Sequence, residues 1–165
     1  MPADEMLTIV SGGQTGVDRA ALDVAIERGI AYRGWCPKGG WAEDRPSPPG
    51  VLALYAGLRE TPEADPRERT EWNVRDCDRL MVLVDRTGLP VSKGTALAIE
   101  CAKALAKPHI VIDIDAGGAE HLAAGFLGEG QGPLALCIGG PRESEAPGIY
   151  VKSKAFLVRL LASRI

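Results

Sequence analysis

The chain has 165 residues, of which 45% are hydrophobic and 25% are charged, and its formal net charge is −3. These proportions are typical of a globular protein, and the length suits one domain with its own core, so we expect a single domain over residues 1–165. The small negative charge excludes the basic field on which nonspecific nucleic-acid binding depends. Any anionic ligand must therefore be held by local groups.

Cysteine and histidine usage gives no metal site. The four cysteines form no C-x-x-C pair, so we expect reduced thiols. His109 and His121 lack the spacing of a metal pair and are interpreted as structural or exposed. The N-terminus shows no secretory signal, and no apolar run reaches the roughly 18 residues of a membrane helix. A cytoplasmic protein that binds neither membrane nor nucleic acid is expected.

Strand and helix patterns alternate from the start of the chain. Leu7–Val10 is a β-prone run that stops at a glycine loop, and apolar residues then repeat at helical spacing from Val17. Thr15 and Asp18 have the spacing of a capping box for this helix, and Gly29 supplies its end.

The next segment contains a second strand and a long loop. Ala31–Trp35 is a candidate strand, and the proline-containing stretch Cys36–Gly50 is expected to be a surface loop. Asp65 followed by Pro66 predicts a helix start, with the helix ending near Asp78. Leu80–Val84 is continuously apolar, as in a strand covered on both faces, and we expect it to be the central strand.

The second half of the chain continues the alternation. We expect a helix opening at Gly94-Thr95 with Leu97, Ala98, Cys101, Ala102 and Leu105 on one face, a strand at Ile110–Ile112, a short helix at Glu120–Phe126, a last strand at Leu134–Ile138, and a C-terminal helix whose apolar stripe runs from Ile149 to Leu161. The alternation predicts an α/β fold of the three-layer, Rossmann-like, doubly wound type. Its mainly parallel sheet would have about five or more strands with helices on both faces.

Three loops that follow strands have phosphate-binding character. They are Ser11–Gly16, Pro90–Thr95 and Gly139–Ser144, which contribute glycine amides, Lys93 and Arg142 respectively. Each loop also has a plain structural interpretation, as a tight turn, a helix cap or a solvated connection. None matches the dinucleotide or P-loop pattern. Because carboxyl ends of parallel strands share one edge, we expect one anion site there.

Catalytic patterns are not apparent. The chain has no serine nucleophile elbow and no Cys-His arrangement. The acidic candidates Glu43, Asp44, Asp85 and Glu100 are mostly interpreted as surface charges. A binding protein without catalytic residues is therefore favoured, and an enzyme remains the alternative.

Four ordered motifs carry a family resemblance: Ser11–Ala20, Arg69–Val74, Lys93–Thr95 and Gly140–Ser144. Together they resemble the molybdenum cofactor carrier family of the SLOG superfamily, which is related to the lysine-decarboxylase-like phosphoribohydrolases. The resemblance runs from about Leu7 to Leu161. It implies a Rossmann-like fold and a homo-oligomer, a dimer or a tetramer.

The resemblance also implies a ligand and the residues that bind it. The ligand would be molybdenum cofactor, a pterin with a terminal phosphate, which the protein would protect and carry, with molybdoenzymes as possible recipients. Residues of the first loop would line the pocket, those around Lys93 would hold phosphate, the third loop would complete the site, and one helix would support it. The full set is Gly12, Gly13, Gln14, Thr15, Gly16, Arg69, Thr70, Asn73, Ser92, Lys93, Gly94, Thr95, Gly140, Arg142, Glu143 and Ser144.

The sequence departs from the related patterns at two positions. The family often has an arginine near the position of Gly40, so a basic lid over the site is less expected here. The hydrolase relatives have a glutamate three residues after the Gly-Thr pair, where this chain has Ala98, which argues against phosphoribohydrolase chemistry. Alternatives left open are an enzyme that processes nucleotides or nucleotide sugars, a nucleotide-ligand sensor of the SLOG type, and an interaction module with an empty pocket.

Overall fold

The computed structural model describes residues 6–88, 92–128 and 132–162. Strands and helices alternate along most of the chain, and two short 3-10 turns, Lys38–Gly40 and Gly50–Ala53, interrupt the long loop. The elements are β1 (Leu7–Val10), α1 (Val17–Glu27), β2 (Ala31–Cys36), β3 (Leu58–Glu60), α2 (Pro66–Arg75), β4 (Arg79–Val84), α3 (Lys93–Ala104), β5 (His109–Asp113), α4 (Ala119–Leu127), β6 (Leu134–Gly139) and α5 (Ile149–Leu161).

The strands form one six-stranded sheet in the order β3-β2-β1-β6-β4-β5, and all of its pairings are parallel. The predicted fold class is thereby confirmed. The prediction that Leu80–Val84 forms the central strand is wrong, because β1 and β6 hold the centre and β4 lies next to the edge strand β5. The apolar run correctly indicated burial, because helices cover both faces of β4. It could not indicate the position of β4 in the sheet, because β6 pairs with both β1 and β4 and so lies between them.

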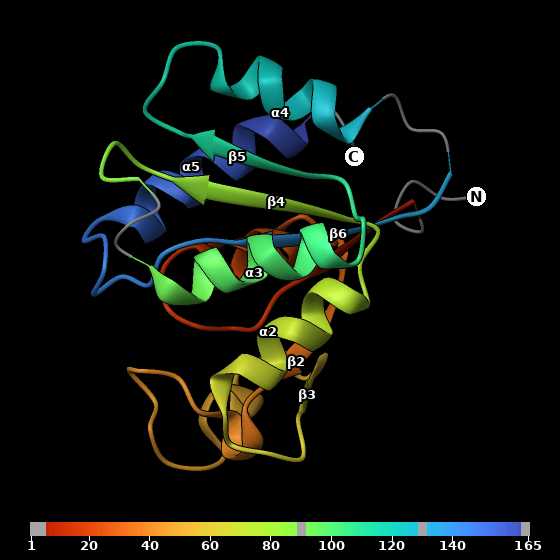
Figure 1. Cartoon of the computed structure of the whole chain (residues 1–165). Coiled ribbons are helices and arrows are strands. Elements are labelled where there is room, and N and C mark those ends of the chain that lie inside the picture. The colour runs from red at the N-terminus through yellow and green to blue at the C-terminus, as the bar shows by residue number, and fades with distance from the viewer. Residues whose placement is uncertain (1–5, 89–91, 129–131, 163–165) are drawn as a thin grey trace.

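Helices cover the sheet in two layers. The larger core joins α1, α4 and α5 to one face, with Ile9, Leu83 and Phe156 among its fully buried residues. The smaller core joins α2 and α3 to the other face, through residues such as Val74 and Ala102. Figure 1 shows α2 and α3 on the near side of the strands and α5 behind them. Helices α2 and α3 therefore lie on the same face of the sheet.

Local side-chain chemistry explains where two helices begin. Asp65 Oδ1 accepts from the Arg67 amide at 2.9 Å ahead of Pro66, as predicted. Ser92 Oγ accepts from the Thr95 amide at 3.2 Å and caps α3. The predicted end near Asp78 is late, because α2 stops at Arg75.

Two local predictions are wrong, the Thr15–Asp18 capping box and the burial of Leu105. Gly16, not Thr15, precedes α1 as its cap, and no side-chain hydrogen bond caps this helix. Asp18 instead accepts from the Gln14 amide, because the glycine loop folds back over the first turn. Leu105 is 48% exposed, since α3 ends before that side chain reaches the sheet.

The loop after β2 is more buried than the expected surface loop. Ala42 and Val51 are fully buried and pack in a small cluster with Leu22 of α1. The loop is followed by β3, a three-residue edge strand that the sequence pattern did not reveal. Of the second predicted anion loop, Pro90 and Val91 lie outside the described residues.

Candidate functional site

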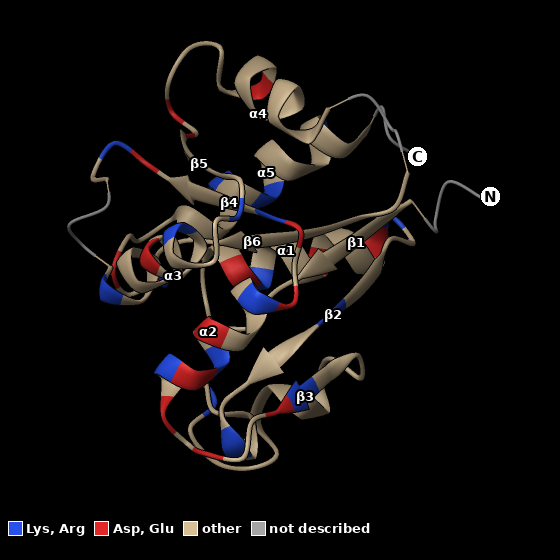
Figure 2. Cartoon of the chain, turned by 45° about the vertical axis from the view of Figure 1, so that its right-hand side comes forward, with Lys and Arg blue, Asp and Glu red and all other residues tan. Residues whose placement is uncertain are grey.

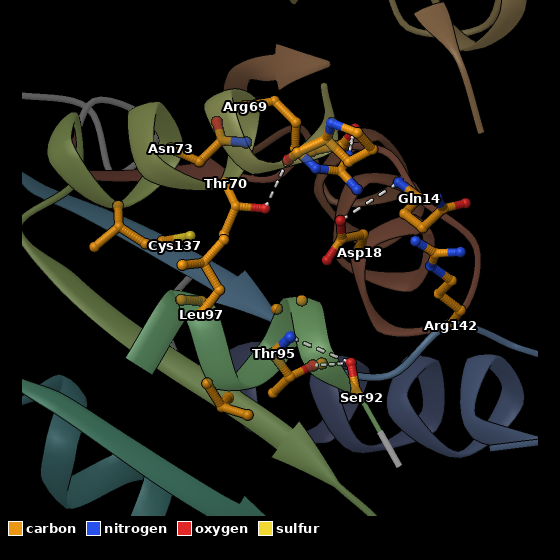
Figure 3. A pocket seen from close by; sticks show the side chains of 18 of the residues that line it. Gln14, Asp18, Arg69, Thr70, Asn73, Ser92, Thr95, Leu97, Cys137 and Arg142 are labelled. Atoms are coloured by element: carbon orange, nitrogen blue, oxygen red, sulfur yellow. Dashed lines mark hydrogen bonds between the residues drawn. The ribbon is translucent and has the colours of Figure 1, made fainter. Parts of the chain in front are cut away.

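A cavity of about 340 Å³ opens where β1, β4 and β6 end, between α2 and α3. The chain leaves β1 toward β2 on one side, while β4 and β5 lie on the other side of β6. Ligands of open parallel sheets bind at such a reversal of strand order. In Figure 3, Gln14, Asp18 and Arg142 come together on one side of the cavity, Arg69, Thr70 and Asn73 line it from α2, and Ser92 and Thr95 line it from α3.

The structure brings most of the sequence-predicted site residues together. Those that line the cavity are Gly12, Gln14, Arg69, Thr70, Asn73, Ser92, Lys93, Gly94, Thr95, Gly140 and Arg142. Among the described residues, the lining does not include Gly13, Thr15, Gly16, Glu143 or Ser144. It does include groups that the sequence reasoning did not assign to the site: the acids Asp18, Asp65 and Glu145, the Cys137 thiol, and the apolar side chains Val74, Leu80, Val82 and Leu97.

Two glycines of the predicted set allow the loops to approach one another. Gly16 has a φ of 78°, and a Cβ there would lie 2.3 Å from the carbonyl oxygen of Pro141. The adjacent Val17 amide donates to that same oxygen at 3.3 Å. A Cβ at Gly140 would lie 2.3 Å from the carbonyl oxygen of Leu83. These positions therefore bring the loop after β6 against the loop after β1 and against strand β4.

Glu43 fastens the outer wall of the site. Its carboxylate accepts from the Thr15 hydroxyl, from the Ser144 hydroxyl at 2.6 Å and from the Ser144 amide at 3.3 Å. Thr15 Oγ1 also accepts from the Glu143 amide at 3.1 Å. Burial raises the pKa of Glu43, but the hydrogen bonds from Ser144 and Thr15 outweigh it and leave the pKa lowered. Thr15, Glu143 and Ser144 thus shape the wall from behind.

Gln14 has a free hydrogen-bond donor beside the cavity. The residue is only 4% exposed, and its Oε1 accepts from the amides of Thr15 and Glu43, both at 3.0 Å. Those two bonds fix the orientation of the side-chain amide. Its Nε2 is buried and has no partner among the described residues. An unpaired buried donor is costly, and a ligand oxygen that reached this nitrogen would remove that cost.

Asp18 and Arg69 are two ionisable side chains that line the cavity. Asp18 is half-buried, and its Oδ2 accepts from the Gln14 amide at 3.4 Å. Burial raises the pKa of Asp18 to about 6, opposed by Arg69, by the Gln14 amide and by Arg19 and Arg142. Arg69 is 7% exposed, and its Nη1 donates to the Gly12 carbonyl at 3.3 Å. Asp18 could have been found from the sequence, because it lies in the first turn of the helix that follows the glycine loop. Its interpretation as part of a capping box hid this role.

The opposite end of the cavity suits an anion. Ser92 Oγ accepts from the Thr95 amide and hydroxyl, the latter at 2.7 Å. The other first amides of α3 have no partner within the helix and point outward from its positive end. Lys93 is exposed there. Arg142 instead lies on the side of Gln14 and Asp18, with its guanidinium 5.6 Å from the centre of the Trp41 ring.

Two other predicted residues act through α2. Asn73 Oδ1 accepts from the Trp35 amide at 2.8 Å, and its Nδ2 donates to the Trp35 carbonyl at 2.9 Å. Thr70 Oγ1 donates to the Pro66 carbonyl at 3.2 Å, one turn earlier in the helix. Asn73 therefore fixes α2 against β2, and both residues line the cavity from this helix.

Apart from Glu43, the acids considered from sequence lie elsewhere. Asp44 pairs with Arg19 at 2.9 Å, Asp85 accepts from Thr87, and Glu100 is exposed on α3. Within residues 6–88, 92–128 and 132–162, no cluster of three His, Cys, Asp or Glu side chains suits a metal ion. His109 opens β5 with its Nδ1 3.0 Å from the Lys107 carbonyl oxygen, and His121 is exposed on α4.

Charge and hydropathy of the remaining surface are mixed. Figure 2 shows acidic and basic residues interspersed along α2 and the loops around it. No helix of the described part of the chain has the length and apolar character to cross a membrane. The four cysteines are free thiols.

Comparison with known proteins identifies the family of this chain. A crystal structure from Syntrophus aciditrophicus SB, named "putative molybdenum carrier protein", matches with a TM-score of 0.80 and 36% sequence identity, over 96% of each chain. No curated protein matches the chain. The model of the circularly permutated YpsA SLOG family matches residues 9–161. The SLOG resemblance noted from the sequence is thereby confirmed, and the chain belongs to the circularly permutated YpsA SLOG family.

Proposed function

We propose that this protein binds a phosphorylated small molecule in the cavity between α2 and α3, and that molybdenum cofactor is the ligand it carries and protects. One observation supports this most: the start of α3 and the basic side chains of Arg69, Lys93 and Arg142 all line the same cavity at the strand ends. The terminal phosphate of the cofactor would lie at Ser92–Thr95, where helix amides and Lys93 favour an anion. The name of the similar Syntrophus aciditrophicus SB structure supports the choice of cargo.

The residues present fit such a cargo. Val74, Leu80, Val82 and Leu97 supply an apolar surface for a flat ring system, while polar groups stand at the rim. Cavities of this size and composition hold small organic ligands of a few hundred Å³.

Mass spectrometry of ligand extracted from protein purified without oxygen tests the proposal, together with the absorbance spectrum before extraction. A phosphorylated pterin in the extract is the expected result. Calorimetric titration with cofactor released from a molybdoenzyme then gives the affinity. Lys93→Ala should weaken binding about tenfold or more, since a charged hydrogen-bond donor to phosphate is lost.

A matched control is Lys103→Ala, which removes an exposed lysine from the last turn of the same helix and should leave the affinity unchanged. If no phosphorylated molecule is retained and none rebinds, the proposal is wrong. In that case an interaction module with an empty pocket would describe the protein better.

A nucleotide-processing enzyme is the second candidate, and one observation favours it. Asp18 is a carboxyl group in the cavity whose pKa burial raises to about 6, a property common among acid–base catalysts. Turnover of a nucleotide by wild-type protein, lost in Asp18→Asn, would favour the enzyme. Binding without turnover would favour the carrier.

We also propose that the protein is a cytoplasmic homo-oligomer that hands its cargo to molybdoenzymes. Exposed apolar side chains available for an interface include Ile26, Leu54, Leu122 and Val151. Sedimentation velocity with and without bound ligand measures the oligomeric state.

A further inference from the structure

Gln14, in the loop after β1, and Asp18, at the start of α1, offer hydrogen-bonding groups that a heterocyclic ring could use. Asp18 contributes a carboxylate, and Gln14 contributes an amide nitrogen that has no partner among the described residues. The two residues are in contact, since the Gln14 backbone amide lies 3.4 Å from Asp18 Oδ2. Figure 3 shows both side chains on the same side of the cavity.

The carboxylate has acceptor capacity to spare. Asp18 Oδ1 makes no hydrogen bond within the described part of the chain, and Oδ2 receives only the long bond from Gln14. An ionised carboxylate accepts about four hydrogen bonds in all. Arg69 lies close by on the other side of Gly12, where a Cβ would be 2.8 Å from Arg69 Nη1 and 3.2 Å from Asp18 Oδ2. This glycine keeps the space between the two charged groups open.

The donor beside it is held in place. Gln14 Oε1 is occupied by two backbone amides, so the side chain cannot rotate to exchange its oxygen and nitrogen without losing both bonds. Nε2 therefore stays a donor. Two acceptor oxygens and one fixed donor, on residues in contact with each other, complement an edge that presents two N–H donors next to one carbonyl oxygen.

The geometry points to Asp18 and Gln14 as the recognition site for a 2-amino-4-oxopyrimidine edge, the edge that pterins and guanine share. The carboxylate of Asp18 would accept from the ring N–H and the amino group, and Gln14 Nε2 would donate to the oxo group. This inference rests on the proposed function, because it assigns the ring end of a ligand whose phosphate lies at α3. It also separates this class from adenine-type rings, which lack the donor pair.

Nucleotides that share a phosphate and differ at this edge test the inference. Calorimetric titration of the full chain with the 5′-monophosphates of guanosine, inosine and adenosine compares two, one and no matching donors. We expect the guanosine ligand to bind about tenfold or more tightly than the inosine ligand, and the adenosine ligand to bind weakest, because a site built for N–H donors discriminates strongly against their absence. 6-Hydroxymethylpterin phosphate, in the same titration, distinguishes a pterin site from a guanine site.

Variants assign the effect to the two residues. Asp18→Asn should bring the guanosine-to-inosine ratio close to one, whereas Asp44→Asn, the same change outside the cavity, should leave it as in wild type. Gln14→Glu keeps the structural oxygen, removes the donor and should weaken guanosine and pterin ligands together. Lys93→Ala should weaken all four ligands alike and leave the ratios unchanged.

The outcomes separate the two proposals. Equal affinities of wild type for the three nucleotides overturn the ring assignment and leave the phosphate-binding function standing. Absence of binding by all four ligands overturns the proposed function and the ring assignment with it. Because the wild-type ratios decide the matter, the test does not depend on any variant folding.

Discussion

The Ser144 hydroxyl donates to Glu43 Oε2 at 2.6 Å, although the two residues are 101 positions apart in the chain. The bond connects the long loop after β2 to the loop after β6, and Thr15 joins the same carboxylate from the loop after β1. Three loops that a local pattern treats separately are thus held by one side chain.

The effect of Glu43→Gln on stability measures that connection. Glutamine keeps one acceptor oxygen and presents an amide nitrogen to the Ser144 donor, so we expect a loss of about 1 kcal/mol in the free energy of unfolding near neutral pH. The folded pKa of Glu43 is lowered, so its stabilisation is present above the unfolded pKa and is lost as the pH falls through the folded pKa.

Urea denaturation as a function of pH checks this sign. The difference between wild type and Glu43→Gln should shrink as the pH falls from neutral toward about 3. Glu71→Gln, an exposed carboxyl on α2, serves as the control and should change little at any pH. A difference that grows in acid would contradict the hydrogen-bond assignment.

The opposite pH dependence is expected of Asp18. Burial raises its folded pKa to about 6, so its contribution to stability is fully present below the unfolded pKa and is lost as the pH rises through about 6. Asp18→Asn removes that loss. Between about pH 4 and pH 8, the free energy of unfolding of the variant relative to wild type should rise by about 2 kcal/mol.

Chemical denaturation at several pH values tests the Asp18 prediction without ligand present. Glu100→Gln, an exposed carboxyl on α3, provides the comparison and should show no such rise. A flat difference for Asp18→Asn would mean that the folded protein solvates this carboxyl as well as water does.

Glycine positions test the close approach of the loops. Gly16→Ala combines a φ of 78° with a Cβ placed 2.3 Å from the Pro141 carbonyl oxygen, so we expect it to cost about 3 kcal/mol. Gly94→Ala in α3 meets no atom within 4 Å and should raise stability by up to about 1 kcal/mol. Thermal unfolding of both variants gives the comparison, and equal effects would show that Gly16 is not sterically required.

Asn73 is expected to act on stability. Asn73→Ala leaves the amide and carbonyl of Trp35 without their side-chain partners, which should cost about 2–3 kcal/mol. Thr70→Ala on the same helix removes only a bond to the preceding turn and should cost far less. Denaturation midpoints of the two variants show whether Asn73 stabilises the fold through Trp35 or only lines the cavity. Equal midpoints would contradict the stabilising role.

Sequence patterns predicted what short-range chemistry determines. Asp65 before Pro66 specified a helix start because a cap acts over three residues, and Leu80–Val84 predicted a doubly covered strand because apolar runs record burial. The insertion of β6 between β1 and β4 depends on pairing partners distant in sequence, which no local run encodes. The three residues of β3 are too few to show a period.

In the candidate site too, local sequence predicted some residues, whereas contacts between distant segments placed others. Glycine loops and the Lys93 loop were visible because each follows a strand and opens a helix, and the structure gathers them at one cavity. Asp18 was overlooked because its side chain is placed by the fold of the loop after β1 and by Arg69. Thr15 and Ser144 were assigned to the pocket, yet they point to Glu43, a partner no spacing rule connects with them.

The proposed ring recognition has its own pH dependence. Protonation of Asp18 removes one of its acceptor oxygens, so discrimination between guanosine and inosine monophosphates should weaken as the pH falls from about 8 to 5, through the folded pKa of about 6. The charged groups that face this carboxyl are Arg69, Arg19 and Arg142. The phosphate also titrates there, but both ligands carry it and its effect cancels in their ratio of affinities. Calorimetry at a series of pH values should show the wild-type ratio approaching one in acid, while Asp18→Asn gives a ratio near one throughout. A wild-type ratio independent of pH would show that Asp18 does not contact the ring.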